Sequence, residues 1–145
     1  MGFMDDKVLC SNKVRLMPDA GLYHFGVLES NIHMAWMRVV SCRLKSDYSY
    51  SINLVYNNFP WPAPTDKQKA KIEQTAQAIL DARVLYPDCS LADLYDVVTM
   101  PPELLKAHQQ NDRAVWEAYG KAWDIRSESE CVAYLMKMYQ ELTKA

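Results

Sequence analysis

Residues 21–62 read GLYHFGVLESNIHMAWMRVVSCRLKSDYSYSINLVYNNFPWP, and this stretch divides the chain into two kinds of sequence. It holds two of the four tryptophans and ends in a cluster of aromatic residues and prolines. Beyond it the apolar residues recur at helical spacing. A surface that mixes basic, aromatic and amide side chains is suited to contact with nucleic acid. The stretch therefore predicts a small lobe with such a surface, followed by a helical region.

The first part of the chain carries several short patterns typical of strands. Residues 8–10 and 14–16 are apolar runs on either side of a polar turn, which predicts strand, turn and strand. Residues 21–28 are a further extended candidate, and the β-branched run at 52–56 predicts another strand. The edges of such strands would be exposed. We therefore expect this part to pack on a partner surface, and its edges would also allow the isolated fragment to pair as a homodimer.

Helices are expected in the remainder. Ser30 is placed to cap a helix over residues 32–44, and three prolines within residues 60–64 then break regular structure. The later start and stop signals are Thr65 with Gln68, Ser90, Pro101 with Pro102, Gly120, and Ser127 with Glu130. We predict an α+β, mainly α fold: a small mixed β/α lobe in residues 1–62, then a helical bundle in residues 63–145.

Net charge and cysteine content limit the kinds of protein that the chain can be. The net charge of -2 disfavours a free-standing nucleic-acid binder. Residues 1–64 carry six Lys and Arg against five Asp and Glu, and residues 65–145 carry ten against thirteen. The four cysteines are far apart and lack a nearby histidine pair, so we expect no metal site, and reduced thiols in a cytoplasmic protein. No apolar run is long enough to span a membrane. Met1 and Met4 offer two potential starts without a core pattern, and we expect a piece of a longer protein.

No catalytic constellation is evident. The sequence has no Gly-rich phosphate loop, nucleophile elbow or zinc-protease motif. Amino-methyltransferases that flip a base hold the target amine with an Asn-Pro-Pro-aromatic loop. Residues 57–60 read NNFP, in the wrong order, and residues 100–102 read MPP, without the Asn. We therefore expect neither a catalytic residue nor a bound cofactor in this chain.

Basic side chains late in the stretch are candidates for contact with DNA. Arg38, Arg43 and Lys45 would reach phosphates or base edges. The alternative is a solvated helix end, which the helix dipole favours. Weaker polar candidates are Asn31, His33, Tyr50, Asn57 and Asn58. For the histidine the alternative is a satisfied, partly buried imidazole, and for the paired asparagines it is hydrogen bonding to loop backbone.

Several separate motifs follow one another in an order that is itself informative. They are FGVLES at 25–30, HMAW at 33–36, RLKSDY at 43–48 with YS at 50–51, YNNFP at 56–60, and LYD and TMPP within residues 91–119. Together they resemble the C-terminal region of the MmeI-like type II restriction–modification DNA methyltransferases. The resemblance covers nearly the whole chain.

The resemblance implies a division of labour. Residues to about Pro62 resemble the end of a target-recognition domain, which reads double-stranded DNA, and the rest resembles the helical domain that packs against it. An upstream methyltransferase domain of the same protein would bind S-adenosylmethionine and methylate adenine N6. The resemblance leaves open whether the full protein also cleaves DNA. Ser49 stands where the family's pattern has a basic residue, which removes the charge for one backbone contact.

Two other function classes stay open on the sequence. A helical protein-interaction module would bind through exposed aromatics, Phe59 and Trp61 included. A small standalone enzyme is disfavoured by the missing constellation. The leading hypothesis is a DNA-recognition fragment without chemistry of its own. Its affinity for DNA in isolation should be weak or undetectable, because a chain of net charge -2 gains little from counterion release.

Overall fold

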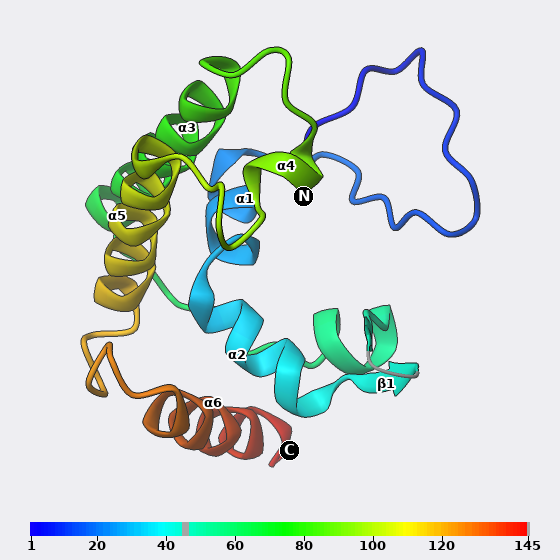
Figure 1. Cartoon of the computed structure of the whole chain (residues 1–145). Helices are drawn as coiled ribbons and strands as arrows, with labels where there is room; N and C mark the ends of the chain where they lie inside the picture. The colour runs from blue at the N-terminus through cyan, green and yellow to red at the C-terminus, as the bar shows by residue number, and fades with distance from the viewer. Residues whose placement is uncertain (45–46, 145) are drawn as a thin grey trace.

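Helices make up most of the chain (Figure 1). The computed structural model describes residues 1–44 and 47–144, and of residues 42–44 it describes the backbone only. In chain order the elements are α1 (Leu22–Leu28), α2 (Asn31–Val40), β1 (Cys42–Leu44), β2 (Asp47–Ser49), the π-helix η1 (Ile52–Tyr56), α3 (Asp66–Val84), α4 (Leu91–Leu94), α5 (Pro102–Ala118) and α6 (Glu128–Thr143). The predicted mainly helical character is confirmed. The β-structure is smaller than predicted, because within the described residues only β1 and β2 pair, as an antiparallel ribbon.

The first 20 residues form a wide loop beside the helices (Figure 1). The strands predicted at residues 8–10 and 14–16 do not form, so that prediction was wrong. Leu9 is 99% exposed and Leu16 is 63% exposed. Two short strands with no further strand or helix to cover them are marginal at best in water. Apolar runs of three residues are also too short to distinguish a strand from irregular backbone.

Two further segments that were expected to be extended are helical instead. Residues 21–28 give α1 with Gly21 as its N-cap, and residues 52–56 give η1. The buried residues of α1 are consecutive, from Phe25 to Leu28, and in η1 only Val55 is buried. Neither pattern is the alternation that a half-buried strand requires. Tertiary packing thus outweighs the weak strand preference of a few β-branched residues.

The helix after Ser30 begins where it was predicted but ends earlier. The Ser30 hydroxyl accepts a hydrogen bond from the His33 N–H at 3.3 Å and so caps α2. The helix ends at Val40 rather than at residue 44, and the chain then turns into β1. The register of the ribbon places Cys42 opposite Ser49. The ribbon therefore projects from the C-terminal end of α2 (Figure 1).

The predicted signals for the later helices are largely confirmed. Thr65 and Gln68 form a reciprocal capping box at the start of α3, and Ser90 caps α4. Gly120 follows α5 with a φ of +74°, a conformation that glycine adopts without strain. Ser127 accepts from the Glu130 N–H at 3.3 Å, but the Glu130 carboxylate accepts from the Asp124 N–H at 3.0 Å instead of closing the box.

The N-terminal part and the helical part share one interior. The two hydrophobic clusters each draw side chains from both sides of residue 62. In the first cluster Trp36 and Val55 pack with Leu135, and in the second Phe25 packs with Ile79. Residues 1–62 thus have a packing partner within this chain, which is the helical part itself. No helix within residues 1–44 and 47–144 is both long and apolar enough to cross a membrane.

A close approach of three helices fixes α1 against the bundle. A Cβ added at Gly26 would lie 2.7 Å from the Ile72 Cγ2 atom of α3 and 3.0 Å from the Asn111 Oδ1 atom of α5. Asn111 is fully buried, and its Nδ2 donates to the Gly26 carbonyl at 2.7 Å. Its Oδ1 lies 3.1 Å from the Thr75 hydroxyl of α3. The absence of a side chain at Gly26 is therefore what allows α1 to lie against α3 and α5.

Candidate nucleic-acid interface

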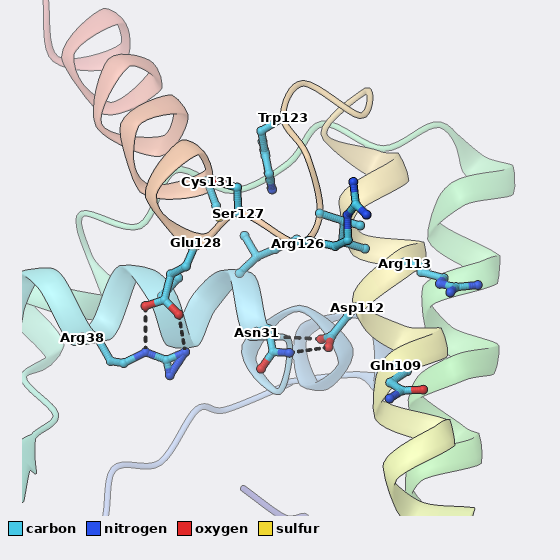
Figure 2. Close-up of a pocket in the computed structure, with 13 residues that line it drawn as sticks. Asn31, Arg38, Gln109, Asp112, Arg113, Trp123, Arg126, Ser127, Glu128 and Cys131 are labelled. Atoms are coloured by element: carbon cyan, nitrogen blue, oxygen red, sulfur yellow. Dashed lines mark hydrogen bonds and ion pairs between the residues drawn. The ribbon is translucent and has the colours of Figure 1, made fainter.

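Arg38 lies near the end of α2, where its guanidinium is held by a carboxylate of another helix. Its Nε and Nη2 atoms donate to the two carboxylate oxygens of Glu128, at 3.0 and 3.2 Å, which is a bidentate pair (Figure 2). The side chains are 33% and 54% exposed. An ion pair with this much solvent contact stabilises a protein by at most about 1 kcal/mol, so it exchanges readily for another anion. The pair with Glu128 thus orients the Arg38 guanidinium at the surface and leaves it able to bind another anion.

The other two basic candidates follow α2 in the sequence. The backbone of Arg43 pairs with Tyr48, and its side chain is outside the described part of the chain. Lys45 lies outside the described residues altogether. All three residues of β2 are exposed. Strand β2 therefore offers exposed side chains shortly after Arg38 in the chain, and the predicted contacts of Arg43 and Lys45 stay predictions.

Asn31 is engaged within the protein. It is the first residue of α2, and its backbone N–H and its Nδ2 donate to the two carboxylate oxygens of Asp112 at 2.8 and 2.7 Å (Figure 2). Asp112 lies on α5 and is 9% exposed, and burial raises the pKa of its carboxyl to about 6. The pair ties the start of α2 to α5. Asn31 itself keeps an exposed flank at the surface.

His33 and Tyr50 form a pair that faces the interior. The His33 side chain is fully buried, its Nε2 lies 2.9 Å from the Tyr50 hydroxyl oxygen, and its ring packs edge-on against Phe59. Burial lowers the pKa of His33 to about 4, so the imidazole is neutral at pH 7. Burial likewise raises the pKa of Tyr50 to about 12. His33 therefore fits a buried imidazole with a structural role better than a surface residue that contacts DNA. Its Nδ1 atom has no hydrogen-bond partner among the described residues.

The paired asparagines serve the π-helix. Asn58 Nδ2 lies 2.8 Å from the carbonyl oxygen of Asn53 and 3.3 Å from that of Leu54. Asn57 Nδ2 donates to the Asn53 Oδ1 at 3.4 Å. Both side chains thus close the end of η1, as expected for amides that satisfy loop backbone. Asn57 is exposed and Asn58 is half-buried, so an outer edge of each remains at the surface.

Of the aromatic residues that were expected to form an exposed binding face, Phe59 is buried and Trp61 is half-buried. Phe59 is 4% exposed and meets both Trp36 and Trp61 in edge-on contacts. The next residue, Pro60, accepts a hydrogen bond at its carbonyl from the Tyr119 hydroxyl at 2.7 Å. The expectation of a protein-binding aromatic face that includes Phe59 was therefore wrong. The cluster instead attaches the end of the N-terminal part to the helical part.

A polar cavity of about 430 Å³ lies between α2, α5 and the start of α6 (Figure 2). Its lining includes Arg38, Asn31 and Asp112 together with three charged residues that the sequence did not single out: Arg113, Arg126 and Glu128. They line the same cavity as Arg38 only because the fold brings α2, α5 and the start of α6 together. Among the described residues, no group of His, Cys, Asp or Glu side chains has an arrangement that would hold a metal ion.

Comparison with known proteins gives consistent matches along the chain. Residues 1–63 match the MmeI target recognition domain, and residues 64–145 match the MmeI C-terminal domain. DNA methyltransferase A of Bacillus subtilis (strain 168) is 40% identical over 144 residues, which are 99% of this chain and 16% of that protein. The solved structure of the type IIL restriction–modification enzyme MmeI in complex with DNA matches with a TM-score of 0.84 and 50% identity. That match covers 88% of this chain and 17% of the MmeI chain, so the chain spans only a small part of both relatives.

Proposed function

Because the chain belongs to the MmeI family, in which it corresponds to the target recognition domain followed by the C-terminal domain, we propose that it forms part of the DNA-reading surface of a restriction–modification methyltransferase. Residues 1–62 would be the end of the reader, and residues 63–145 would hold it in place. The observation that carries this proposal is the 50% identity and TM-score of 0.84 to an enzyme whose structure includes DNA.

The proposed contact surface centres on the end of α2 and the ribbon. Arg38 is partly exposed and pairs with an exposed carboxylate, and the exposed strand β2 follows a few residues later in the chain. Arg43 and Lys45 lie between α2 and β2 in the sequence. Guanidinium groups suit phosphates and guanine edges, because they donate two parallel hydrogen bonds. Asn31, Asn57 and Asn58 would add contacts through their outer edges. His33 and Tyr50 would act indirectly, by fixing the ribbon to α2.

The chemistry of the parent protein would reside outside this chain. We place S-adenosylmethionine binding and methyl transfer to adenine N6 in an upstream methyltransferase domain of the same protein, in the cytoplasm. Nothing in the described cavities requires this chain to bind that cofactor. The role of residues 1–145 is then recognition and its structural support, with double-stranded DNA and the upstream domain as partners.

Binding of a fluorescent duplex at low salt, followed by anisotropy, tests this proposal. Replacing Arg38, Arg43 and Lys45 together by Gln should weaken binding about tenfold or more, because each lost phosphate contact removes a counterion-release contribution. The matched control replaces three exposed lysines outside this surface, Lys67, Lys137 and Lys144, by Gln. It should change affinity by less than about twofold. Equal weakening by both triple variants would contradict a localised DNA surface.

A further inference from the structure

The loop of residues 1–20, which stands out beside the helices in Figure 1, places large apolar side chains in solvent. Those that are at least 46% exposed are Met1, Phe3, Met4, Val8, Leu9, Val14 and Leu16. Single exposed apolar residues are common on any protein, but a concentration of them marks an interaction surface. The loop is also long for a segment without helix or strand, and such loops are usually functional or lack a fixed structure.

An apolar cavity of about 600 Å³ lies where this loop meets the rest of the chain. Its walls are residues 15–18 of the loop together with Met1, Leu28, Tyr50, Ile52 and Tyr56. The polar atoms of its two tyrosines are already engaged. The Tyr50 hydroxyl pairs with His33 Nε2, and the Tyr56 hydroxyl donates to the sulfur of Met17 at 3.6 Å. The cavity therefore offers mainly apolar surface to whatever enters it.

The fold of this chain does not use the apolar side chains in the middle of the loop. Among the described residues, the hydrogen bonds of residues 4–16 all stay within the loop. An example is the bond from the Val14 N–H to the Ser11 carbonyl at 3.0 Å. A ring contact does join the start of the loop to α1, where the centroids of Phe3 and Phe25 are 5.5 Å apart. Most of the loop is therefore free to pack on something else.

The charge of the loop limits what can cover it. Residues 1–20 contain three Lys and Arg and three Asp, so their net charge is zero. Association with DNA depends on positive charge that releases counterions from the phosphates, so a duplex is a poor partner for this segment. Burial of apolar side chains drives most association between protein surfaces instead. The chemistry of the loop and the cavity thus fits an apolar protein surface.

The parent protein supplies such a surface more readily than a second copy does. Residues 1–63 match a target recognition domain, and the chain spans only a small part of both relatives. A segment that is covalently linked to the loop is present at an effective concentration on the order of 1 mM. A second copy in dilute solution is far less concentrated. Linkage therefore favours polypeptide of the same parent protein as the occupant.

We propose that residues 1–20 and the apolar cavity beside them form the surface on which the preceding part of the target recognition domain packs in the parent protein. This inference rests on the proposed function, which supplies that parent. Apolar side chains of the preceding part would enter the cavity and cover Leu9 and Leu16. Tyr50 lines the cavity and directly follows β2, so the same packing would hold the ribbon in place for its contact with DNA.

Thiol labelling of a matched pair of variants tests this surface. Leu16 lines the cavity and is 63% exposed, whereas Leu85 follows α3, does not line the cavity and is 64% exposed. Leu16→Cys and Leu85→Cys are each made in the chain alone and in the full-length parent, and alkylation by iodoacetamide is followed by mass spectrometry of the peptides that contain these positions. Both thiols should react at rates within about threefold in the chain alone, because their exposure is alike. In the parent, Leu16→Cys should react at least about tenfold more slowly, and Leu85→Cys should change by less than about twofold.

The outcomes separate this inference from the proposed function. An unchanged rate for Leu16→Cys in the parent would overturn the packing surface, and equal slowing at both positions would contradict its location. A chain that sediments as a dimer by itself, with position 16 already slowed, would identify a second copy as the occupant and overturn the proposal. The proposed function is judged independently, by duplex binding of the Arg38, Arg43 and Lys45 variant. Slow labelling at position 16 in a parent that binds no duplex would keep the packing surface and overturn the DNA-reading role.

Discussion

Adding a methyl group at Gly26 should loosen the contact that seats the N-terminal part on the bundle. The new Cβ in a Gly26→Ala variant would meet Ile72 Cγ2 at 2.7 Å, Asn111 Oδ1 at 3.0 Å and Ala76 Cβ at 3.2 Å. The first distance is shorter than real Cβ contacts allow. Ile72 is fully buried and Asn111 is hydrogen-bonded to the Gly26 carbonyl, so neither can retreat freely. Helix α1 must therefore shift.

Two opposing terms set the size of the effect. Alanine is a better helix former than glycine by about 1 kcal/mol, whereas overpacking a well-filled core costs about 1–3 kcal/mol. The clash involves fully buried atoms, so its cost should lie in the upper part of that range, at about 2–3 kcal/mol, and the net loss should be about 1–2 kcal/mol. In a chain of this size such a loss lowers Tm by about 3–8 °C. Urea unfolding followed by circular dichroism measures it directly.

A double-mutant cycle identifies the cause. Ile72→Leu moves the methyl group away from Cβ, so the offending Cγ2 atom disappears at a cost below about 1.5 kcal/mol. The Gly26→Ala change should then be less damaging in the Ile72→Leu background, with a coupling energy of about 0.5–1.5 kcal/mol. Gly2 has nothing within 4 Å of an added Cβ, and Gly2→Ala serves as the control. A Gly26→Ala variant as stable as wild type, or additivity in the cycle, would refute the close packing of α1 on α3.

Other perturbations follow from the same contacts. Asn111→Ala should cost about 2–4 kcal/mol in urea unfolding, because it leaves the buried Gly26 carbonyl without its donor and opens a small cavity; a cost below that of an average surface change would contradict the role of this amide. Asp112 has a folded pKa raised to about 6 from 3.8, so its favourable contribution is present at low pH and is lost as the pH rises through 6. The Asp112→Asn variant should thus gain stability relative to wild type as the pH rises from 3.8 to about 6. A difference in unfolding free energy between the two proteins that does not change with pH would argue against the raised pKa. His33 has the opposite sign: its folded pKa of about 4 lies below 6.5, so wild type should lose stability relative to His33→Gln as the pH falls from about 6.5 to 4. Arg38→Gln should change stability by less than about 1 kcal/mol, since its ion pair is exposed, yet it should weaken duplex binding; a large loss of stability with unchanged binding would mean that Arg38 is structural.

The sequence predicted the helices well where a capping residue stood directly before a run of apolar residues at helical spacing. Ser30, Thr65 and Ser90 each cap the helix that follows, because a hydroxyl acceptor at this position depends only on the next three residues. The strand predictions failed at 21–28 and 52–56, because burial there is set by neighbours far along the chain. Gly26 is an example: its partners Ile72 and Asn111 lie 46 and 85 positions further along the chain, so no short stretch of sequence contains them.

The candidate site was predictable only in part, for the same reason. Arg38 stands out locally as a basic residue at a helix end, but its partner Glu128 is 90 positions away. Asn31 and Asp112 are 81 positions apart, and the cavity that they help to line is assembled from α2, α5 and α6. Composition gave no sign that the second half of the chain contributes basic residues to the cavity, since that half has more acidic than basic residues. Arg113 and Arg126 of that half line a cavity together with Arg38 only because the fold brings their segments together.

Mapping a bound duplex onto the chain by amide chemical shifts in two-dimensional NMR tests whether the end of α2 and the ribbon that follows it face DNA. We expect the shifts to concentrate at the end of α2 and in the ribbon, and to fade as salt is raised. Shifts confined to α4 and the outer side of α3, or spread evenly over the chain, would contradict it.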